Sequence, residues 1–187
     1  MPAVSGYRKE GMLHGGPAYT YPGINKKGRA DVATLEERID AVESRAKISE
    51  LRSAYARFAS SGNAYGVASL FTEDCVFDGP MGAGKGRGII NGNKALGDFL
   101  APQIGKIGAV LPLISNEIIK VTGDTAKGWC LMQTPMAPGF GALVCEYFDE
   151  CKRIDGTWYF AKRTMFLFQP VYEERPANYA QMEPTGR

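Results

Sequence analysis

The sequence predicts an α+β domain in which a curved antiparallel sheet wraps around N-terminal helices. Apolar residues recur at three- and four-residue steps between residues 35 and 58, as on one buried helix face. From about residue 107 to residue 170 the pattern changes to short alternating segments separated by turn residues. Because the helices precede the strands instead of alternating with them, an α+β arrangement is favoured. The 187 residues suffice for one domain with its own core.

The first helix begins near Thr34, which forms a capping box with Glu37, and Asp31 is an alternative cap. We expect its apolar stripe to continue for roughly six turns, although the early part could be a separate short helix before a bend. The stripe comprises Leu35, Ile39, Val42, Ala46, Ile48, Leu51, Tyr55 and Phe58. Residues 60–63 end this helix, and Asn63 can cap a short second helix that leads into the first strand. A third helix is expected over residues 92–100.

Four further strands are expected in the second half of the chain, at residues 110–121, 126–134, 143–154 and 158–168. Asp155-Gly156 between the last two is a strong hairpin signal. The glycine-dense stretch 79–88 is not a phosphate-binding loop, since its Gly-Lys is followed by Gly, and a flap at a pocket mouth is favoured. We expect residues 1–30 to form an N-terminal arm, 31–170 the domain and 171–187 a C-terminal tail.

Composition excludes several classes of function. The net charge of +2, without a basic run, argues against nucleic-acid binding, and no long apolar run suggests a membrane span. The four cysteines (Cys75, Cys130, Cys145 and Cys151) lack the paired spacing of metal sites, so we expect buried free thiols in a cytoplasmic protein. The single histidine, His14, excludes any mechanism or metal site that needs two histidines from one subunit. We expect neither a cofactor nor a metal.

Candidate catalytic residues lie on the last two predicted strands. Alternation places Tyr147 and Asp149 on the more apolar face, which we expect to point inward. Asp149 is then either a base or the partner of a structural ion pair, for example with Arg163. If the face of the last strand that carries Trp158 points inward, Lys162 is carried inward too, as a proton donor or oxyanion clamp, unless it extends past the sheet edge to water. If the opposite face is inward, Arg163 takes the clamp role.

Tyr55, on the first helix, is either a core residue or a hydrogen-bond donor in a pocket. The expected lining of the cavity is strongly aromatic and apolar, which suits an uncharged aromatic or polycyclic ligand. The substrate-contacting candidates are Phe58, Phe71, Phe77, Trp129, Met132, Tyr147 and Phe166.

The order of the motifs resembles the SnoaL-like branch of the nuclear transport factor 2-like (NTF2-like) superfamily. The motifs are the helix Tyr, Leu70-Phe71, Thr72-Glu73-Asp74, residues 114–118, and the closing hairpin from Tyr147 to Trp158. The resemblance covers roughly residues 33–170 and implies a cone-shaped fold. It also implies a dehydratase, cyclase, isomerase or carbon–carbon lyase. The family's Asp and His positions hold Ser60 and Pro112 or Leu113 here, which argues against ordinary dehydration.

The sequence therefore predicts a cofactor-independent lyase or isomerase that uses acid-base side chains on a small aromatic or polycyclic apolar substrate. The alternative is a non-catalytic binding or carrier module for an apolar molecule, and a third is a subunit of a larger assembly. We expect a homodimer or homotrimer, because the N-terminal arm and the outer sheet face both offer apolar surface. The substrate and the bond acted on are left open.

Overall fold

The structure, a computed structural model, describes residues 33–82, 85–105, 110–135, 141–170, 172–182 and 184. The expected N-terminal arm, with His14, lies outside these residues. The elements are α1 (Leu35–Ser60), α2 (Ala64–Ala68), β1 (Phe71–Pro80), β2 (Arg87–Asn91), α3 (Asn93–Ile104), β3 (Leu113–Thr122), β4 (Thr125–Pro135), β5 (Ala142–Ile154), β6 (Thr157–Gln169) and α4 (Tyr179–Met182).

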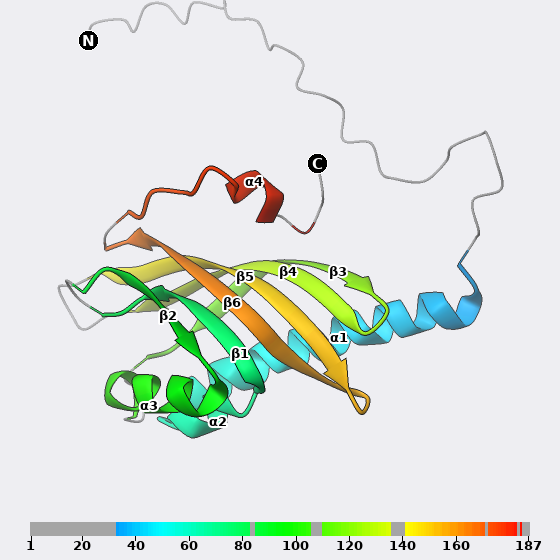
Figure 1. Ribbon diagram of the computed structural model, residues 1–187, viewed down its shortest axis with the longest axis horizontal. Coiled ribbons are helices and arrows are strands. Elements are labelled where there is room, and N and C mark those ends of the chain that lie inside the picture. Colours follow the sequence, from blue (N-terminus) through cyan, green and yellow to red (C-terminus); the bar gives the residue numbers. More distant parts are fainter. Residues whose placement is uncertain are drawn as a thin grey trace, which may run out of the picture. The chain divides into compact units, whose positions relative to one another are not determined.

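The six strands form one sheet in the order β2-β1-β6-β5-β4-β3. Neighbouring strands are antiparallel except β1 and β6, which are parallel. Figure 1 shows the sheet curving around α1, with α2 and α3 at one end. The predicted α+β fold with a curved sheet around N-terminal helices is confirmed. None of the helices in the described part of the chain is long and apolar enough to cross a membrane.

Helix α1 begins with the predicted capping box, in which the Glu37 N–H donates to Thr34 Oγ1 and the Thr34 N–H donates to the Glu37 carboxylate. It is a single 26-residue helix, so the separate early helix is wrong. The expected continuous stripe is also wrong. Ile48 and Leu51 are buried, but Leu35, Ile39 and Val42 are 63%, 49% and 63% exposed. The two-residue step between Ala46 and Ile48 turns the stripe by about 200°, onto the other side of the helix.

The turn between β5 and β6 forms at the residues that the sequence predicts. Asp155 and Gly156, both at positive φ (49° and 79°), make the tight β5–β6 turn. The glycine-dense stretch differs from the expected flap, since β2 starts at Arg87 and pairs with β1 from Pro80 back to Val76. Residues 83 and 84 lie outside the description.

A β-bulge in β6 reverses the faces of that strand. Cys151 pairs with Phe160 and Glu150 with Lys162, so Ala161 is an extra residue. Trp158 and Phe160 therefore face α1, but beyond the bulge it is Arg163 that does so. The expectation that Lys162 follows Trp158 inward is therefore wrong, because Lys162 lies on the outer face, as does Phe166.

A second bulge lies in β3, where Ser115 pairs with Leu131 and Ile118 with Trp129. Two residues, Asn116 and Glu117, thus oppose one, and Asn116 has a φ of 57°. The bulge turns Glu117 toward α1, where it meets Arg52.

Candidate functional site

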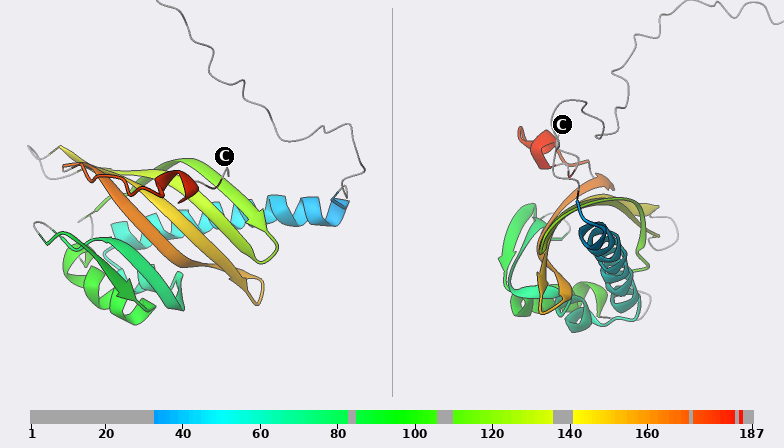
Figure 2. Two further views of the ribbon diagram at one scale, coloured as in Figure 1. Left: turned by 45° about the horizontal axis from the view of Figure 1, so that its top comes forward. Right: turned by 90° about the vertical axis from the view of Figure 1, so that its right-hand side faces the viewer.

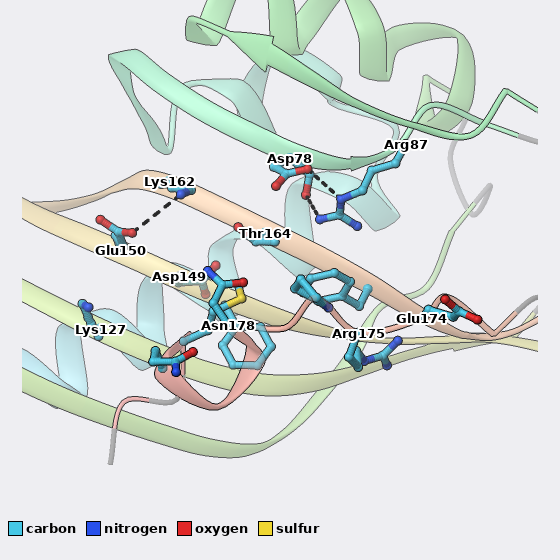
Figure 3. Close-up of a pocket in the computed structure, with 15 residues that line it drawn as sticks. Asp78, Arg87, Lys127, Asp149, Glu150, Lys162, Thr164, Glu174, Arg175 and Asn178 are labelled. Carbon is cyan, nitrogen blue, oxygen red and sulfur yellow. Dashed lines mark hydrogen bonds and ion pairs between the residues drawn. The ribbon is translucent and has the colours of Figure 1, made fainter. Parts of the chain in front are cut away.

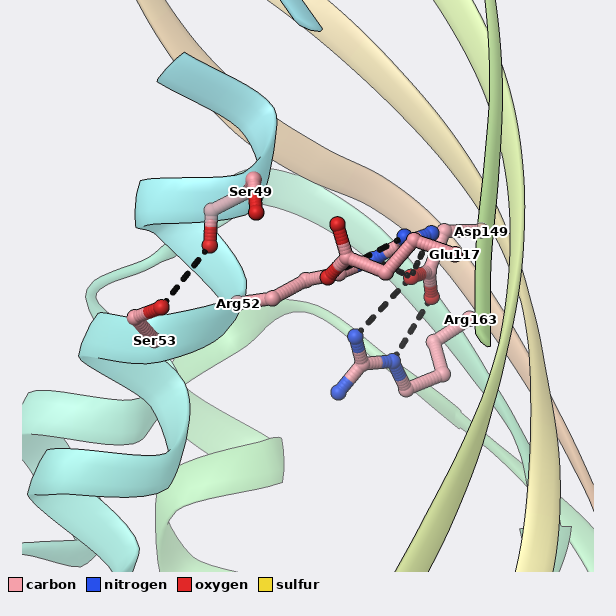
Figure 4. Close-up of polar contacts among 6 residues, drawn as sticks. All are labelled: Ser49, Arg52, Ser53, Glu117, Asp149 and Arg163. Carbon is pink, nitrogen blue, oxygen red and sulfur yellow. Dashed lines mark hydrogen bonds and ion pairs between the residues drawn. The ribbon is translucent and has the colours of Figure 1, made fainter. Parts of the chain in front are cut away.

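A buried ion network joins α1 to the concave face of the sheet (Figure 4). Arg163 on β6 donates from Nε to Asp149 Oδ1 at 2.7 Å and from Nη2 to Oδ2 at 3.0 Å. Arg52 on α1 donates from Nε and Nη2 to the same Oδ2 at 3.3 and 3.2 Å. Their three side chains are at most 1% exposed. One carboxylate therefore holds two guanidinium groups in the core.

Glu117 completes the charge balance, since its Oε1 lies 3.6 Å from Arg52 Nη1 and its side chain is 25% exposed. Two cations and two anions thus meet from α1, β3, β5 and β6. Burial alone would lower the pKa of Arg163, but the charge and hydrogen bonds of Asp149 outweigh it and raise that pKa above its ordinary value. The guanidinium is therefore charged at every working pH.

Aromatic rings surround the Arg163 guanidinium. Its Cζ lies 4.1 Å from the centroid of the Tyr147 ring, 4.2 Å from that of Phe160 and 4.5 Å from that of Tyr55. The two tyrosine rings meet edge to face with centroids 6.1 Å apart. Burial raises the pKa of Tyr147 well above its ordinary value, so its hydroxyl is neutral and can donate a hydrogen bond. The rings supply cation–π stabilisation in a place shielded from water.

One nitrogen of Arg163 has no partner in this arrangement. Its Nη1 is buried and makes no hydrogen bond to any residue that the structure describes. Figure 4 shows the free end of the guanidinium pointing away from Asp149. Because an unsatisfied buried donor costs about 1–3 kcal/mol, Nη1 is a suitable donor for an acceptor oxygen on a ligand.

Apolar side chains surround the network on the concave side. Phe71, Phe77 and Met132 are buried there, and Phe58 is partly buried against the same core. Strand pairing places the C-terminal ends of β1, β4 and β6 and the N-terminal ends of β3 and β5 at the same end of the sheet. Several apolar residues packed against the core are only partly buried there: Phe58, Met81, Phe99, Val110, Ile114, Leu143 and Leu167. The concave side is therefore apolar at this end of the sheet.

A second, more polar site lies on the outer face of the sheet (Figure 3). It is a groove of about 620 Å³ between the sheet and residues 174–182. Four of its charged side chains form two ion pairs, with Arg87 Nε 2.8 Å from Asp78 Oδ1 and Lys162 Nζ 3.9 Å from Glu150 Oε1. Such mutually paired, partly exposed charges do not suit an apolar ligand.

The C-terminal segment is attached to this outer face through Glu146, which is buried. Arg175 Nε lies 2.8 Å from Glu146 Oε1, and Tyr179 Oη and Trp129 Nε1 each donate to Oε2 at 2.9 Å. Burial and the bond to Glu146 raise the pKa of Tyr179 to about 12. The residues expected to form a tail thus pack on the sheet from Glu173 to Met182.

Comparison with known proteins assigns the family. The profile of the SnoaL-like domain matches residues 40–164. The chain belongs to the SnoaL-like family. The resemblance seen in the sequence motifs is thereby confirmed. No curated protein sequence matches this SnoaL-like chain.

Solved structures share the fold of this SnoaL-like protein at low sequence identity. An NTF2-like protein with a cystatin-like fold from Novosphingobium aromaticivorans has a TM-score of 0.64 at 20% identity, over 83% of this chain and 98% of that one. The function-unknown protein Rv3472 from Mycobacterium tuberculosis has a TM-score of 0.61 at 20% identity, over 81% and 82%. A hexachlorocyclohexane dehydrochlorinase, LinA type 2, has a TM-score of 0.54 at 20% identity, over 75% and 99%.

The SnoaL-like fold brings four of the five predicted catalytic residues together. Tyr55, Tyr147, Asp149 and Arg163 meet on the concave side. Lys162 lies outside with Glu150, because the bulge at Ala161 turns it away. Of the two alternatives for Asp149, the geometry is that of the ion pair with Arg163.

The predicted lining residues divide between the two faces. Phe58, Phe71, Phe77 and Met132 pack on the concave side. Trp129 and Phe166 lie outside, where Trp129 bonds Glu146 and the Phe166 ring contacts Tyr179 at a centroid distance of 6.3 Å. Their placement follows from strand alternation in β4 and from the bulge in β6.

The positions of the family's missing Asp and His carry no acid-base group. The Ser60 hydroxyl donates to the Arg57 carbonyl at the end of α1. Leu113 is an exposed residue at the start of β3.

Sequence reasoning missed Arg52 and Glu117. Arg52 had a usable signal, since it lies four residues after Ile48 and three before Tyr55, within the buried stripe. Glu117 had none, because only the bulge in β3 turns it inward.

Proposed function

We propose that this chain is a cofactor-independent lyase or isomerase for a small apolar molecule that carries a carbonyl or hydroxyl oxygen. The observation that carries the proposal is the buried Nη1 of Arg163, a charged donor without a partner among the described residues, beside Tyr55 and Tyr147. Such a donor stabilises negative charge that develops on a substrate oxygen.

Each member of the network has a role in this reaction. Asp149 fixes the plane of the Arg163 guanidinium through two hydrogen bonds, so the charge is preorganised. The hydroxyls of Tyr55 and Tyr147 supply further donors to the oxyanion. Asp149 accepts from two guanidinium groups and is a poor candidate for the base. Glu117, with its single longer ion pair and partial exposure, is the better one.

The chemistry is a proton transfer next to a carbonyl group. Glu117 takes a proton from carbon, and the electron pair moves onto the oxygen, where Arg163 and the tyrosines hold it. Return of the proton to another carbon completes an isomerisation, whereas departure of a leaving group with the electron pair completes an elimination. The dehydrochlorinase among the structural neighbours is named for hexachlorocyclohexane, a small apolar molecule, which supports an apolar substrate of this size. The aromatic surroundings favour an aromatic or polycyclic body.

A phenolate probe tests the oxyanion site. 4-Nitrophenol combines an aromatic body with an oxygen whose ionisation is visible by absorbance. The wild type should bind the phenolate form and lower the apparent pKa of the bound phenol by about one unit or more, equivalent to roughly 1.4 kcal/mol. Tyr55→Phe should reduce this shift and Arg163→Met should abolish it. Lys162→Met is the matched control and should leave it unchanged. Equal shifts in all four proteins would contradict the proposal.

Two observations favour a binding or carrier module as the second candidate. Asp149 is fully engaged by arginines, and the positions of the family's Asp and His hold Ser60 and Pro112 or Leu113. A carrier would still bind 4-nitrophenolate through Arg163. It would not exchange the α-protons of an aromatic ketone such as α-tetralone with deuterated solvent. Exchange that Glu117→Gln abolishes would favour the enzyme.

A further inference from the structure

The exposed apolar stripe on the N-terminal half of α1 has no partner among the described residues. Leu35, Ile39, Val42 and Ala46 follow one another at steps of four, three and four residues, and all four are exposed. They lie on the side of the helix opposite the buried Ser44, Ile48 and Leu51, roughly 180° around the axis. Figure 2 shows this end of α1 projecting past the ends of the strands.

The charges beside this stripe have a regular order. In a heptad frame Leu35 and Val42 take position d, and Ile39 and Ala46 take position a. Position g is then Arg38 and Arg45, and position e is Glu36, Glu43 and Glu50. These five side chains are exposed and form no ion pair with the rest of the described chain. One flank of the stripe is therefore basic and the other acidic.

We propose that a second copy of this chain packs on the stripe and forms a parallel two-stranded coiled coil through the two α1 helices. In a parallel pair, position g of one helix faces position e of the other, so Arg38 meets Glu43 of the partner subunit and Arg45 meets Glu50 of the partner subunit. In an antiparallel pair, like positions would meet, basic against basic and acidic against acidic. The charge pattern therefore selects the parallel arrangement.

The rest of the domain permits this assembly. Because the buried face of α1 is opposite the stripe, a two-fold axis along the helices places the two sheets on opposite sides. The helix is already held by its own domain, so the pair does not bear the cost of nucleating it. The stripe spans fewer than two heptads, less than a standard interface of ~1,600 Å² needs, so we expect a weak, concentration-dependent dimer. This inference does not depend on the proposed function.

Sedimentation velocity of the full chain over a concentration series tests the proposal. The wild type should shift from monomer to dimer as the concentration rises. Ile39→Glu combined with Val42→Glu should remain monomeric throughout. Lys47→Glu, an exposed residue at position b, away from the stripe, is the matched control and should dimerise like the wild type. A wild type that is monomeric at every concentration overturns the proposal, and residues 1–32 or another protein then become the candidate occupants of the stripe.

A charge exchange tests the partner and its orientation. We consider two double variants, Arg38→Glu/Arg45→Glu and Glu43→Arg/Glu50→Arg. Each should weaken self-association at least tenfold. A mixture of the two variants should recover association as a heterodimer. Val42→Cys should form a disulfide-linked dimer under mild oxidation, because identical d positions face each other only in the parallel pair. A dimer that persists in the Ile39→Glu/Val42→Glu variant would place the interface elsewhere and overturn the proposal.

Discussion

Asp149 illustrates how one residue can bind two elements together through charge. It is the only described carboxylate that touches both Arg52 and Arg163, and all three are buried. Burying charges costs free energy unless each is paired, so the network stabilises the fold only while it is complete. Replacing any one of its charged residues alone should therefore lower the stability of the fold.

Replacing Asp149 by Asn should destabilise the protein strongly. The change leaves the buried Arg163 guanidinium without a counter-ion and Arg52 with only its longer ion pair to Glu117, which costs about 3–5 kcal/mol. Urea unfolding monitored by circular dichroism measures this loss. Glu150→Gln, the next residue on the opposite face, is the control. It removes a pair whose side chains are 43% and 56% exposed, so the change should be below about 1 kcal/mol. Equal losses in both variants would show that the network is not tightly held.

Gly128 on β4 leaves the space that Arg52 occupies. A Cβ at this glycine would lie 2.3 Å from Arg52 Nη2, which no real contact allows. Gly128→Ala should therefore displace the Arg52 head from Asp149 and destabilise the protein by about 1–3 kcal/mol. Thermal unfolding measures the effect, with Ala126→Gly on the same face as a comparison for strand propensity. An unchanged melting temperature in Gly128→Ala would mean that Arg52 can bind Asp149 from another position.

The sequence predicted the inward position of Tyr147 and Asp149 because strand alternation is a local rule that β5 obeys. It could not decide between Lys162 and Arg163, since the choice depends on one extra residue in β6. Whether a bulge forms at Ala161 is determined by the neighbouring strands, not by the residues beside it. Arg52 was missed because a single charged residue within an apolar stripe is normally interpreted as exposed. Only the structure shows that Asp149 is its buried partner.

At the scale of elements, the C-terminal segment depends on one buried carboxylate. Glu146 forms an ion pair with Arg175 and accepts hydrogen bonds from Trp129 and Tyr179. The Arg175 guanidinium also lies 4.4 Å from the Phe168 ring centroid and 5.1 Å from that of Phe166. Arg175 is therefore the main contact between this segment and the sheet.

Replacing Arg175 by Met should release the segment from the outer face. Glu146 loses its counter-ion and regains water only if the segment moves away, so stability should fall by about 1–3 kcal/mol. Limited proteolysis should then cleave within residues 172–182 faster than in the wild type. Glu174→Gln, an exposed neighbour, should leave the cleavage rate unchanged. If Arg175→Met is cleaved no faster, packing of Tyr179 alone suffices to hold the segment.

The elements whose ends carry local signals were predicted well. The capping box of Thr34 and Glu37, the Asn63 cap and the Asp155-Gly156 turn all form as expected. The apolar stripe of α1 moves to the other side of the helix between Ala46 and Ile48. This shift was missed from the sequence because a stripe with one two-residue step still looks continuous when only its apolar residues are counted. The packing of residues 173–182 on the sheet could not be predicted, since it depends on Glu146, which is distant in sequence.

At the scale of the whole molecule, the concave side of the sheet buries most of the core residues. The four cysteines are free and buried there. Burial raises the pKa of both Cys130 and Cys145 to about 12, and that of Cys75 and Cys151 above the ordinary value. Folding and protonation of these thiols are therefore linked.

The free energy of unfolding should fall as the pH rises above about 9, the ordinary thiol pKa. Below that pH both states keep their thiol protons, and the linkage contributes nothing to the slope. Above it the unfolded chain loses protons that folded Cys130 and Cys145 retain up to about pH 12, so the unfolded state is favoured. Each thiol should contribute about 1.4 kcal/mol of lost stability by about pH 10.

Urea unfolding at a series of pH values, with a reductant present, measures the slope. The Cys130→Ala/Cys145→Ala variant should be less stable at neutral pH but show a shallower decline above pH 9. An identical slope in both proteins would mean that these two thiols ionise in the folded state as readily as in the unfolded one, and burial would then not raise their pKa.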